Sequence, residues 1–377
     1  MKRVLCILSC MNAGGAETFL MKIYRQLDRT KYQMDFCVNI FEEGFYDKEI
    51  IKMGGRIFHI PSKSDNLKEF KRQLTTIIKE DHYESVLRIT SNTMGFLDLK
   101  VAKKAGAKVC AARSSNSNDP AGIKAKVAHR LGRILYGKYV DVKIAPSDLA
   151  AIYTFGEQSY KNGEVIILHN ALDLDVYKFE PEERKRIRSE FGVKESEILC
   201  GHVGRFSPQK NHDFLIDIFS ELCKERSNYK LLLVGNGELE EKIREKCSDK
   251  GLQDKVIFAG VRSDIPAILS AMDVFVFPSL YEGMPNTVIE AQATGLPCVI
   301  SDTITKEADV TGLVKYVSLS DMKCWISTIK NMLNMPRRNM SELMNSKGYG
   351  ISYVVHQFEQ VIFCDESSHG VEGRKND

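Results

Sequence analysis

The sequence predicts an α/β protein made of two doubly wound units, each with a parallel sheet covered by helices. Its length of 377 residues is more than one domain usually needs. Short apolar runs alternate with helical patterns in both halves of the chain, as βαβ units do. A charged segment at about 171–197 has no strand pattern and separates the two halves.

In the first half, apolar runs without polar alternation predict strands that are mostly buried on both faces. They are 3–8, 33–39, 56–60, 85–90, 107–113, 140–146 and 164–170. Apolar residues recur at helical spacing between them, at 14–27, 46–54, 66–80 and 122–138.

The alternation restarts in the second half. Strands are expected at 198–204, 229–235, 255–260, 273–279 and 297–301, and helices near 211–226, 238–250, 263–271 and 286–294. A last helical pattern follows at 351–363. Ligands of such folds bind beyond the carboxyl ends of the strands, so we expect the site in a cleft between the two units.

The composition describes an ordinary globular protein, with 43% hydrophobic and 27% charged residues. A net charge of +3 gives no reason to expect a nucleic acid partner. No apolar stretch is long enough to cross a membrane, and the apolar start runs into a Gly-Gly turn, as a first strand does. The ten cysteines stand singly without CxxC spacing, so we expect reduced thiols.

Two turns between a strand and a helix carry residues suited to a phosphate. In MNAGGAE, Gly14 and Gly15 permit a close backbone approach before a helix start, although a tight turn alone also explains them. In GRFSPQKN, Arg205 and Lys210 can add charge-assisted bonds to the helix dipole and so clamp a diphosphate.

Two further turns carry weaker signals. GNGELEE at 235–241 resembles a dinucleotide fingerprint only superficially, because Glu240 stands in place of the third glycine. In AGVRSDIP, Val261 and Arg262 could line a base pocket, or Ser263 or Asp264 could simply cap a helix.

The segment EGMPNTVIEAQATGLPCVISD holds two carboxylates, Glu282 and Glu290, on either side of a helix start near Asn286. A carboxylate accepts hydrogen bonds from two hydroxyls at once, so the pair suits a polyhydroxylated ligand. The alternative is a helix cap beside a surface glutamate.

Together, GGAE, GRFSPQKN and PSLYEGMPNTVIEAQATGLPCVISD resemble the family 4 retaining glycosyltransferases over nearly the whole chain. The resemblance implies the GT-B fold, with two Rossmann-like domains facing a central cleft. We expect an acceptor-side domain at 1–170 that the C-terminal helix at 351–364 completes, a nucleotide-sugar domain at 171–345 and a flexible tail at 365–377. The EG-x-PN motif is similar to that of bacterial enzymes of capsule and exopolysaccharide synthesis.

The resemblance also implies roles for individual residues. Arg205 and Lys210 would hold the donor diphosphate and stabilise the leaving group, Glu282 would lie at the transferred sugar, and Glu290 would bind the ribose. The expected donor-binding residues are Gly14, Gly15, Arg205, Lys210, Val261, Arg262, Glu282, Gly283, Met284, Asn286, Thr287 and Glu290. No DxD metal site is assigned, so no metal or other cofactor is expected.

One departure from the family lies in the first half of the chain. Many relatives carry a histidine near the sugar after the strand that matches VCAAR, whereas this chain reads Arg113-Ser114-Ser115-Asn116. We expect Arg113, Ser115 and Asn116 on the acceptor side. His129 is interpreted as a surface residue of the next helix.

That helix, at 123–138, combines an apolar stripe with basic residues. Such a helix can rest on an anionic membrane surface, although an ordinary helix packed on the core has the same pattern. The stripe is Ile123, Val127, Leu131, Ile134 and Leu135, and the basic residues are Lys124, Lys126, Arg130, Arg133 and Lys138.

The sequence therefore predicts a cytoplasmic retaining hexosyltransferase, peripheral at the inner face of the cell membrane. It would transfer a sugar from a nucleotide sugar, with UDP as the expected nucleotide, to a glycan or lipid-linked acceptor in cell-surface polysaccharide synthesis. Two alternatives stay open, a non-catalytic GT-B partner subunit of a glycan-assembly complex and a GT-B nucleotide-sugar epimerase.

Overall fold

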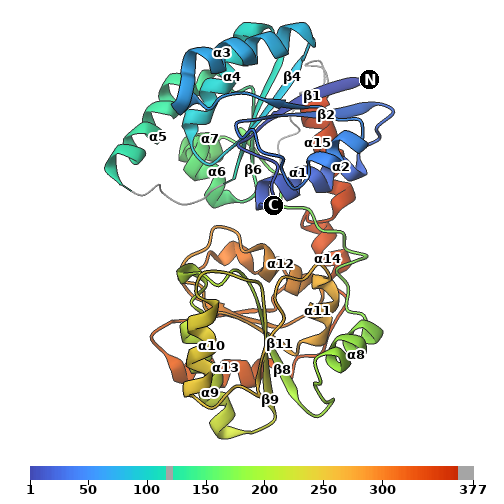
Figure 1. Cartoon of the computed structure of the whole chain (residues 1–377), viewed down its shortest axis with the longest axis vertical. Coiled ribbons are helices and arrows are strands. Elements are labelled where there is room, and N and C mark those ends of the chain that lie inside the picture. The colour runs from blue at the N-terminus through green and yellow to red at the C-terminus, as the bar shows by residue number, and fades with distance from the viewer. Residues whose placement is uncertain (116–121, 364–377) are drawn as a thin grey trace. The chain divides into compact units, whose positions relative to one another are not determined.

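The computed structural model describes residues 1–115 and 122–363 (Figure 1). Its contacts divide the chain into two compact units. Unit 1 is Met1–Ala171 together with the chain from Ile351 onward, and unit 2 is Leu172–Gly350. The chain thus leaves unit 1 after Ala171 and returns to it for the last helix.

Unit 1 is built on a parallel sheet of seven strands in the order β3-β2-β1-β4-β5-β6-β7. The strands are β1 Lys2–Ile7, β2 Tyr32–Val38, β3 Ile57–His59, β4 Ser85–Thr90, β5 Val109–Ser114, β6 Val142–Ala145 and β7 Val165–Ile167. Its helices are α1 Gly15–Gln26, α2 Asp47–Lys52, α3 Lys63–Glu80, α4 Phe96–Ala105, α5 Ile123–Tyr136, α6 Asp148–Phe155, α7 Glu157–Lys161 and α15 Ile351–Phe363, with 3₁₀ turns η1 Thr93–Gly95 and η2 Gly137–Tyr139.

Unit 2 is built on a parallel sheet of six strands in the order β10-β9-β8-β11-β12-β13. The strands are β8 Ile198–Val203, β9 Tyr229–Val234, β10 Val256–Phe258, β11 Val274–Phe277, β12 Cys298–Ser301 and β13 Val314–Val317. Its helices are α8 Pro181–Glu190, α9 His212–Glu225, α10 Glu240–Asp249, α11 Ile265–Ala271, α12 Asn286–Ala293, α13 Met322–Met332 and α14 Ser341–Ser346, with 3₁₀ turns η3 Pro208–Lys210 and η4 Lys306–Ala308.

Helices cover both faces of each sheet (Figure 1), so each unit has two apolar cores. In unit 1, α1, α2 and α15 pack on one face and α3, α4 and α6 on the other. In unit 2, α9, α10 and α13 oppose α8, α11 and α12. The predicted class, two doubly wound parallel-sheet units, is confirmed.

The strand order places the switch points of the two sheets. Chain order reverses direction between β1 and β4 in unit 1 and between β8 and β11 in unit 2. Loops that leave the carboxyl ends of these neighbouring strands diverge and leave a crevice for a ligand. The residues singled out after β1, β8 and β11 therefore stand where such folds bind ligands.

The last helix is an integral part of unit 1. Val354, Phe358 and Ile362 of α15 are buried in the same core as α1. Two main-chain carbonyls at the helix end accept bonds from the sheet, Phe363 O from Lys2 Nζ at 2.8 Å and Ile362 O from Ser85 Oγ at 2.8 Å.

The cysteines behave as expected in the described residues. Nine of them are free thiols, and six of these are buried. Within the same residues, no helix is long and apolar enough to cross a membrane.

Candidate functional site

An ion pair joins two predicted site residues at the switch point of unit 2. Lys210 Nζ lies 2.6 Å from Glu282 Oε1, and the side chains are only 18% and 10% exposed. Ser279 Oγ donates to the same carboxylate oxygen at 3.0 Å, and the Lys210 ammonium lies 4.7 Å from the centre of the Phe277 ring. The loops after β8 and β11 thus meet in one polar cluster.

The local backbone positions Lys210 next to the loop after β11. Lys210 ends the short turn η3, and Asn211 follows in a left-handed conformation, with φ +54°, before α9 begins. Two bonds fasten η3 to the loop after β11, because Leu280 N donates to Gln209 O at 2.8 Å and Gln209 Nε2 donates to Tyr281 O at 2.9 Å.

Arg205 takes part in a different ion pair. Its Nη2 lies 3.2 Å from Glu238 Oε2, and its side chain is 72% exposed. Glu238 belongs to the GNGELEE turn, in which Gly235 has φ +133° and a Cβ there would lie 2.2 Å from Gly204 O. The glycines of this turn therefore serve the close packing of two loops, and Glu238 is a site neighbour that the sequence analysis missed.

The helix start predicted near Asn286 is confirmed, because α12 runs over Asn286–Ala293 with Pro285 before it. Gly283 and Met284 lie in the preceding loop, while Asn286 and Thr287 form the first turn.

Glu290, one turn into α12, has a neighbour that the sequence pattern does not indicate. Its carboxylate accepts a hydrogen bond from the Tyr177 hydroxyl. Burial, and then the charge and hydrogen bond of Glu290, raise the pKa of Tyr177. Tyr177 lies in the charged segment that was interpreted only as a boundary.

The AGVRSDIP turn is held by charge pairs. Arg262 lies 2.6 Å from Glu190 Oε1 and 2.8 Å from Asp264 Oδ1, whereas Val261 is largely exposed. Asp264 stands immediately before α11, but its side chain makes no capping bond. The hydrogen bonds from Arg262, then from Arg186, lower the pKa of Asp264 to about 2.

Two buried histidines lie beside Lys210. His202 Nδ1 bonds to Val276 O at 2.9 Å, and the His212 ring stacks on Phe206 with centroids 4.2 Å apart. Among the described residues, His202 Nε2 and both ring nitrogens of His212 have no hydrogen-bond partner. Burial, and then the Lys210 charge, lower the pKa of His212 to about 4, so the imidazole is neutral at pH 7.

In unit 1, the Gly14–Gly15 turn has the expected position after β1. Gly14 precedes α1, Gly15 begins it, and Gly14 N donates to Asn12 O at 2.8 Å. A Cβ at Gly14 would lie 2.3 Å from Glu17 Oε2, so glycine lets the Glu17 side chain fold over the turn.

Arg113, at the end of β5, is 2% exposed. Its Nη2 donates to Asn170 Oδ1 at 2.8 Å, and its guanidinium lies 3.5 Å from the centre of the Phe19 ring. Burial lowers the pKa of Arg113 to about 9. Ser115 is exposed, and Asn116 lies outside the described residues.

The interpretation of His129 as a surface residue is wrong. His129 is 7% exposed, and its ring stacks on Tyr153 with centroids 4.3 Å apart. Its Nε2 lies 2.9 Å from Tyr153 O. The helical pattern does not predict the burial of His129, because this residue faces η1 and α6 on a side of α5 that carries mainly small residues.

The alternative of a core-packed apolar stripe on α5 is also wrong. All five residues of the stripe are exposed, from 48% at Leu131 to 82% at Ile123. The buried side of α5 is instead formed by His129 and Gly132, and a Cβ at Gly132 would lie 2.6 Å from Thr93 Oγ1.

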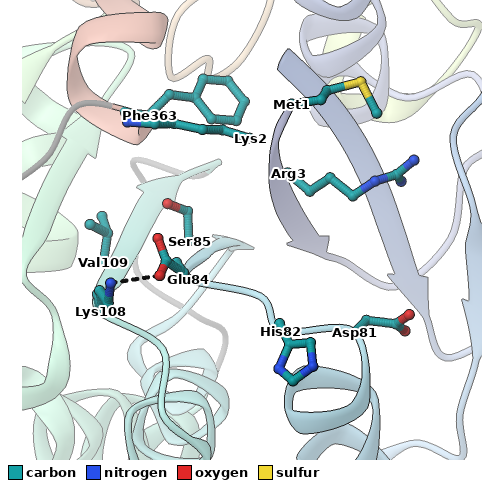
Figure 2. Close-up of a pocket in the computed structure, with 10 residues that line it drawn as sticks. All are labelled: Met1, Lys2, Arg3, Asp81, His82, Glu84, Ser85, Lys108, Val109 and Phe363. Atoms are coloured by element: carbon teal, nitrogen blue, oxygen red, sulfur yellow. Dashed lines mark hydrogen bonds and ion pairs between the residues drawn. The ribbon is translucent and has the colours of Figure 1, made fainter. Parts of the chain in front are cut away.

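Two cavities lie away from the Lys210–Glu282 pair. One of about 480 Å³ is bordered by the amino ends of β1, β4 and β5, opposite the ligand edge, and includes the Lys108–Glu84 ion pair (Figure 2). Another of about 410 Å³ lies in unit 2 beside Tyr177, Glu180 and Pro266. In the described residues, no group of three or more His, Cys, Asp or Glu side chains is placed to hold a metal ion.

Comparison with known proteins gives consistent matches. The family model described as "Glycosyl transferases group 1" matches residues 183–317. The chain is 34% identical to a putative glycosyltransferase, EpsF, of Bacillus subtilis, over 92% of this chain and 93% of that protein. It is 36% identical to a UDP-Gal:alpha-D-GlcNAc-diphosphoundecaprenol alpha-1,3-galactosyltransferase of Escherichia coli, over 37% of each chain.

Among solved structures, Anabaena Alr3699/HepE in complex with UDP has a similar fold, with a TM-score of 0.76. That match covers 96% of this chain and 99% of the other at 18% identity.

Proposed function

Because this chain belongs to the group 1 family of glycosyltransferases, we propose that it is a retaining enzyme that moves a sugar from a UDP-linked donor to a glycan or lipid-linked acceptor. The observation that carries the proposal is the Lys210–Glu282 pair, a nearly buried cation and carboxylate at the carboxyl ends of β8 and β11. A nucleotide sugar presents both an anionic diphosphate and sugar hydroxyls, which these two groups suit.

In this assignment both members of the ion pair also bind the donor. The Lys210 ammonium has three N–H donors, and Glu282 takes one of them. The others are assigned to a phosphate oxygen, with Arg205 as a second cation from the same loop. Glu282 accepts from a hydroxyl of the sugar, and Glu290, oriented by Tyr177, accepts from the ribose.

The chemistry needs stabilisation of a leaving group more than a strong base. The bond from the anomeric carbon to the diphosphate oxygen breaks, and a bond to the acceptor oxygen forms on the same face of the sugar. The acceptor proton passes to the departing phosphate. Lys210, Arg205 and the start of α12 would stabilise the negative charge that grows on the diphosphate.

In this arrangement Lys210 and Arg205 supply the positive charge that a metal ion supplies in other transferases. We therefore propose that the enzyme needs no metal cofactor. Transfer should persist after treatment with EDTA. Loss of transfer in EDTA with recovery on adding Mg²⁺ or Mn²⁺ would contradict the proposal.

The assignment is tested by turnover. The purified protein is incubated with UDP-glucose, UDP-galactose, UDP-N-acetylglucosamine and UDP-N-acetylgalactosamine, and UDP release is followed with and without candidate acceptors. Wild type should release UDP from one of these donors, and Lys210→Ala should lower kcat by about 10²-fold or more, since a group that stabilises the leaving charge is lost. Glu290→Gln should mainly raise the KM for the donor.

Neither alternative, the partner subunit nor the epimerase, is favoured by the comparisons above. A wild-type protein that releases UDP from none of the donors would count against the transferase. An α-linked product from an α-linked donor, identified by NMR, would support retention, and the opposite anomer would exclude it.

We further propose that α5 holds the enzyme at an anionic membrane surface, where lipid-linked acceptors are presented. The exposed stripe of α5 is flanked by exposed Lys124, Lys126 and Arg130, so its apolar face and its charge suit the same surface. The acceptor named for the Escherichia coli relative carries a diphosphoundecaprenol group, which supports a lipid-linked acceptor here.

Flotation with vesicles tests this placement. Wild type should float with phosphatidylglycerol vesicles and much less with phosphatidylcholine vesicles. Serine at Ile123, Val127 and Leu131 should abolish flotation, whereas Leu280→Ser, a change of an exposed leucine in unit 2, should not. Equal flotation of the triple variant and wild type would exclude α5 as the contact.

A further inference from the structure

A pair of exposed aromatic rings marks the loop that follows β2. Phe41 is 67% exposed and Phe45 is 71% exposed. Contact of an apolar side chain with water is unfavourable. Two exposed phenylalanines within one short loop therefore indicate a binding surface. We call Phe41 and Phe45, with the carboxylates of Glu42 and Glu43 between them, the aromatic loop.

Each of the two rings has an aromatic neighbour in unit 1. Phe41 stacks on His59, with centroids 6.1 Å apart, and Phe45 meets Tyr46 edge-on at 4.9 Å. His59 Nδ1 in turn lies 2.6 Å from Ile40 O. Each ring thus contacts one neighbouring ring and leaves most of its surface open to a ligand.

The aromatic loop is fastened to the loop that carries Gly14 and Gly15. Phe45 N donates to Asn12 Oδ1 at 3.1 Å, and Tyr46 N donates to Met11 O at 2.9 Å. A Cβ at Gly44 would lie 3.1 Å from Met11 O, so glycine permits this close approach. The rings therefore stand beside the switch point of unit 1, at the ligand edge of its sheet.

Charge distinguishes this surface from α5. The apolar stripe of α5 is flanked by lysine and arginine, which suits anionic lipid. The aromatic loop carries Glu42 and Glu43 instead. Glu43 lies 3.4 Å from Lys48 Nζ, so Glu42 is the carboxylate whose charge an anionic membrane would repel. Carboxylates accept hydrogen bonds from hydroxyls, and the electron-rich face of an aromatic ring attracts the C–H face of a pyranose.

We propose that the aromatic loop is an acceptor subsite, in which Phe41 and Phe45 stack on a pyranose ring and Glu42 accepts from its hydroxyls. This inference rests on the proposed function, because it names the acceptor's terminal sugar as the group that the loop receives. The loop would hold that sugar on the same edge of unit 1 as the Gly14–Gly15 turn.

The test measures sugar binding and nucleotide binding separately. Methyl glycosides of glucose, galactose, N-acetylglucosamine and N-acetylgalactosamine are titrated by saturation-transfer NMR, and UDP by calorimetry. The double variant Phe41→Ala/Phe45→Ala should weaken the glycoside that binds wild type by roughly fivefold or more, given the strength of aromatic stacking. UDP affinity should stay unchanged.

Two further variants sharpen the result. Phe41→Leu/Phe45→Leu keeps an apolar surface without an aromatic face, so it should lose the glycoside like the alanine pair. Ile51→Ala removes an exposed apolar side chain from α2 nearby and should bind as wild type does. Circular dichroism shows that each variant is folded.

Undiminished glycoside affinity in the leucine pair would overturn the stacking role. Absence of glycoside binding to wild type that binds UDP would overturn the subsite and leave the proposed function standing. Absence of UDP binding would contradict the proposed function, while the glycoside series would still decide the subsite.

Discussion

At the scale of single residues, the surroundings of Lys210 matter as much as its own charge. His202 and His212 beside the ammonium are neutral, because burial and the charge of Lys210 lower the pKa of both imidazoles. The two neutral imidazoles add no charge of their own, so Lys210 supplies the positive charge of this cluster. This supports the assignment of Lys210 to an anionic ligand.

The lowered pKa of His212 has a consequence for stability. The unfolded chain takes up a proton at His212 near the ordinary value of 6.5, whereas the folded chain does so only at about 4. Between these values the unfolded state binds more protons, so the free energy of unfolding falls as the pH drops from about 6.5 to 4.

Replacing His212 by phenylalanine should remove this dependence. The ring stacks on Phe206 and its nitrogens have no partner in the described residues, so phenylalanine should fit. Between pH 6.5 and pH 4, the free energy of unfolding of wild type should fall further than that of His212→Phe. The difference should reach about 3 kcal/mol at pH 4. His356→Gln, a change at an exposed position, is the control. Parallel pH profiles of wild type and His212→Phe would refute the role of this histidine.

Sequence reasoning found the residues that carry charge and missed those that support them. Lys210 and Glu282 stand in recognisable motifs, and the structure brings them within 2.6 Å. Tyr177 and Glu238 have no local signal, because their partners Glu290 and Arg205 lie 113 and 33 positions away in the chain.

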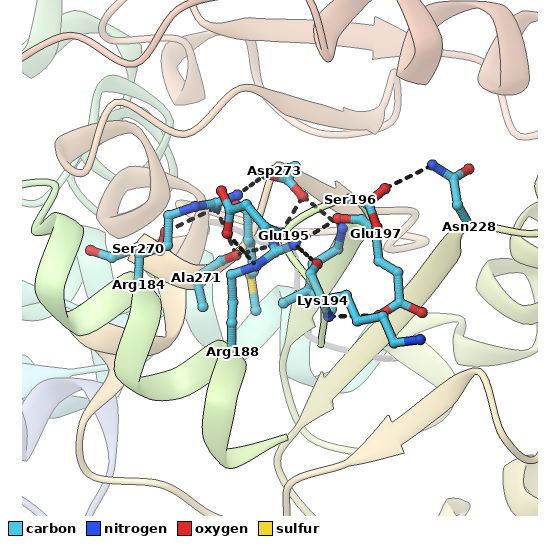
Figure 3. Close-up of polar contacts among 12 residues, drawn as sticks. Arg184, Arg188, Lys194, Glu195, Ser196, Glu197, Asn228, Ser270, Ala271 and Asp273 are labelled. Carbon is cyan, nitrogen blue, oxygen red and sulfur yellow. Dashed lines mark hydrogen bonds and ion pairs between the residues drawn. The ribbon is translucent and has the colours of Figure 1, made fainter. Parts of the chain in front are cut away.

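At the scale of elements, α8 clamps the amino ends of two strands of unit 2. Asp273, just before β11, accepts from Arg184 Nη2 at 2.8 Å, from Arg188 Nη1 at 3.3 Å and from Leu199 N at 2.7 Å (Figure 3). Arg188 is 2% exposed and also donates to Glu197 O at 2.6 Å. This cluster fixes the strands whose opposite ends carry Lys210 and Glu282.

Asp273→Asn should therefore destabilise unit 2. It leaves the buried guanidinium of Arg188 without its nearest carboxylate, and we expect a loss of about 2–3 kcal/mol, somewhat less than for a fully buried pair because Asp273 is partly exposed. Differential scanning calorimetry should show a lower midpoint for one transition. Asp249→Asn, a change at an exposed end of α10, should unfold at the same temperature as wild type. An unchanged midpoint in Asp273→Asn would mean that the cluster does not stabilise unit 2.

Helix α5 shows what periodicity can predict and what it cannot. The pattern places the helix within two residues of its observed bounds, Ile123–Tyr136. The pattern does not tell which face is buried, because the close contact of Gly132 with Thr93 depends on η1, which lies about 40 residues earlier. The small residues of α5 face the protein, and its large apolar residues face outward.

At the scale of the whole molecule, one strand order is used twice. Both sheets begin with a 3-2-1-4-5-6 order, and unit 2 is inserted between β7 and α15 of unit 1. Alternation of strands and helices predicted this class, since buried parallel strands leave continuous apolar runs. It missed β13, whose four residues include an exposed lysine. It also missed the helices α4, α6, α7, α8, α13 and α14, of which α8 lies in the segment interpreted only as a boundary.

The central claim is that unit 2 binds a nucleotide sugar through Lys210. Calorimetric titration of UDP into the full-length protein tests this most directly, with Lys210→Ala and a matched variant, Lys246→Ala. Lys246 is also ion-paired, at 2.9 Å from Asp213 and Asp217, and is 20% exposed, close to the 18% of Lys210, but lies on α10.

Wild type and Lys246→Ala should bind UDP with the same affinity, and Lys210→Ala should bind it at least about tenfold more weakly, since a charge-assisted bond to phosphate is lost. Equal UDP affinity in Lys210→Ala and wild type, or no UDP binding by wild type, would contradict the account.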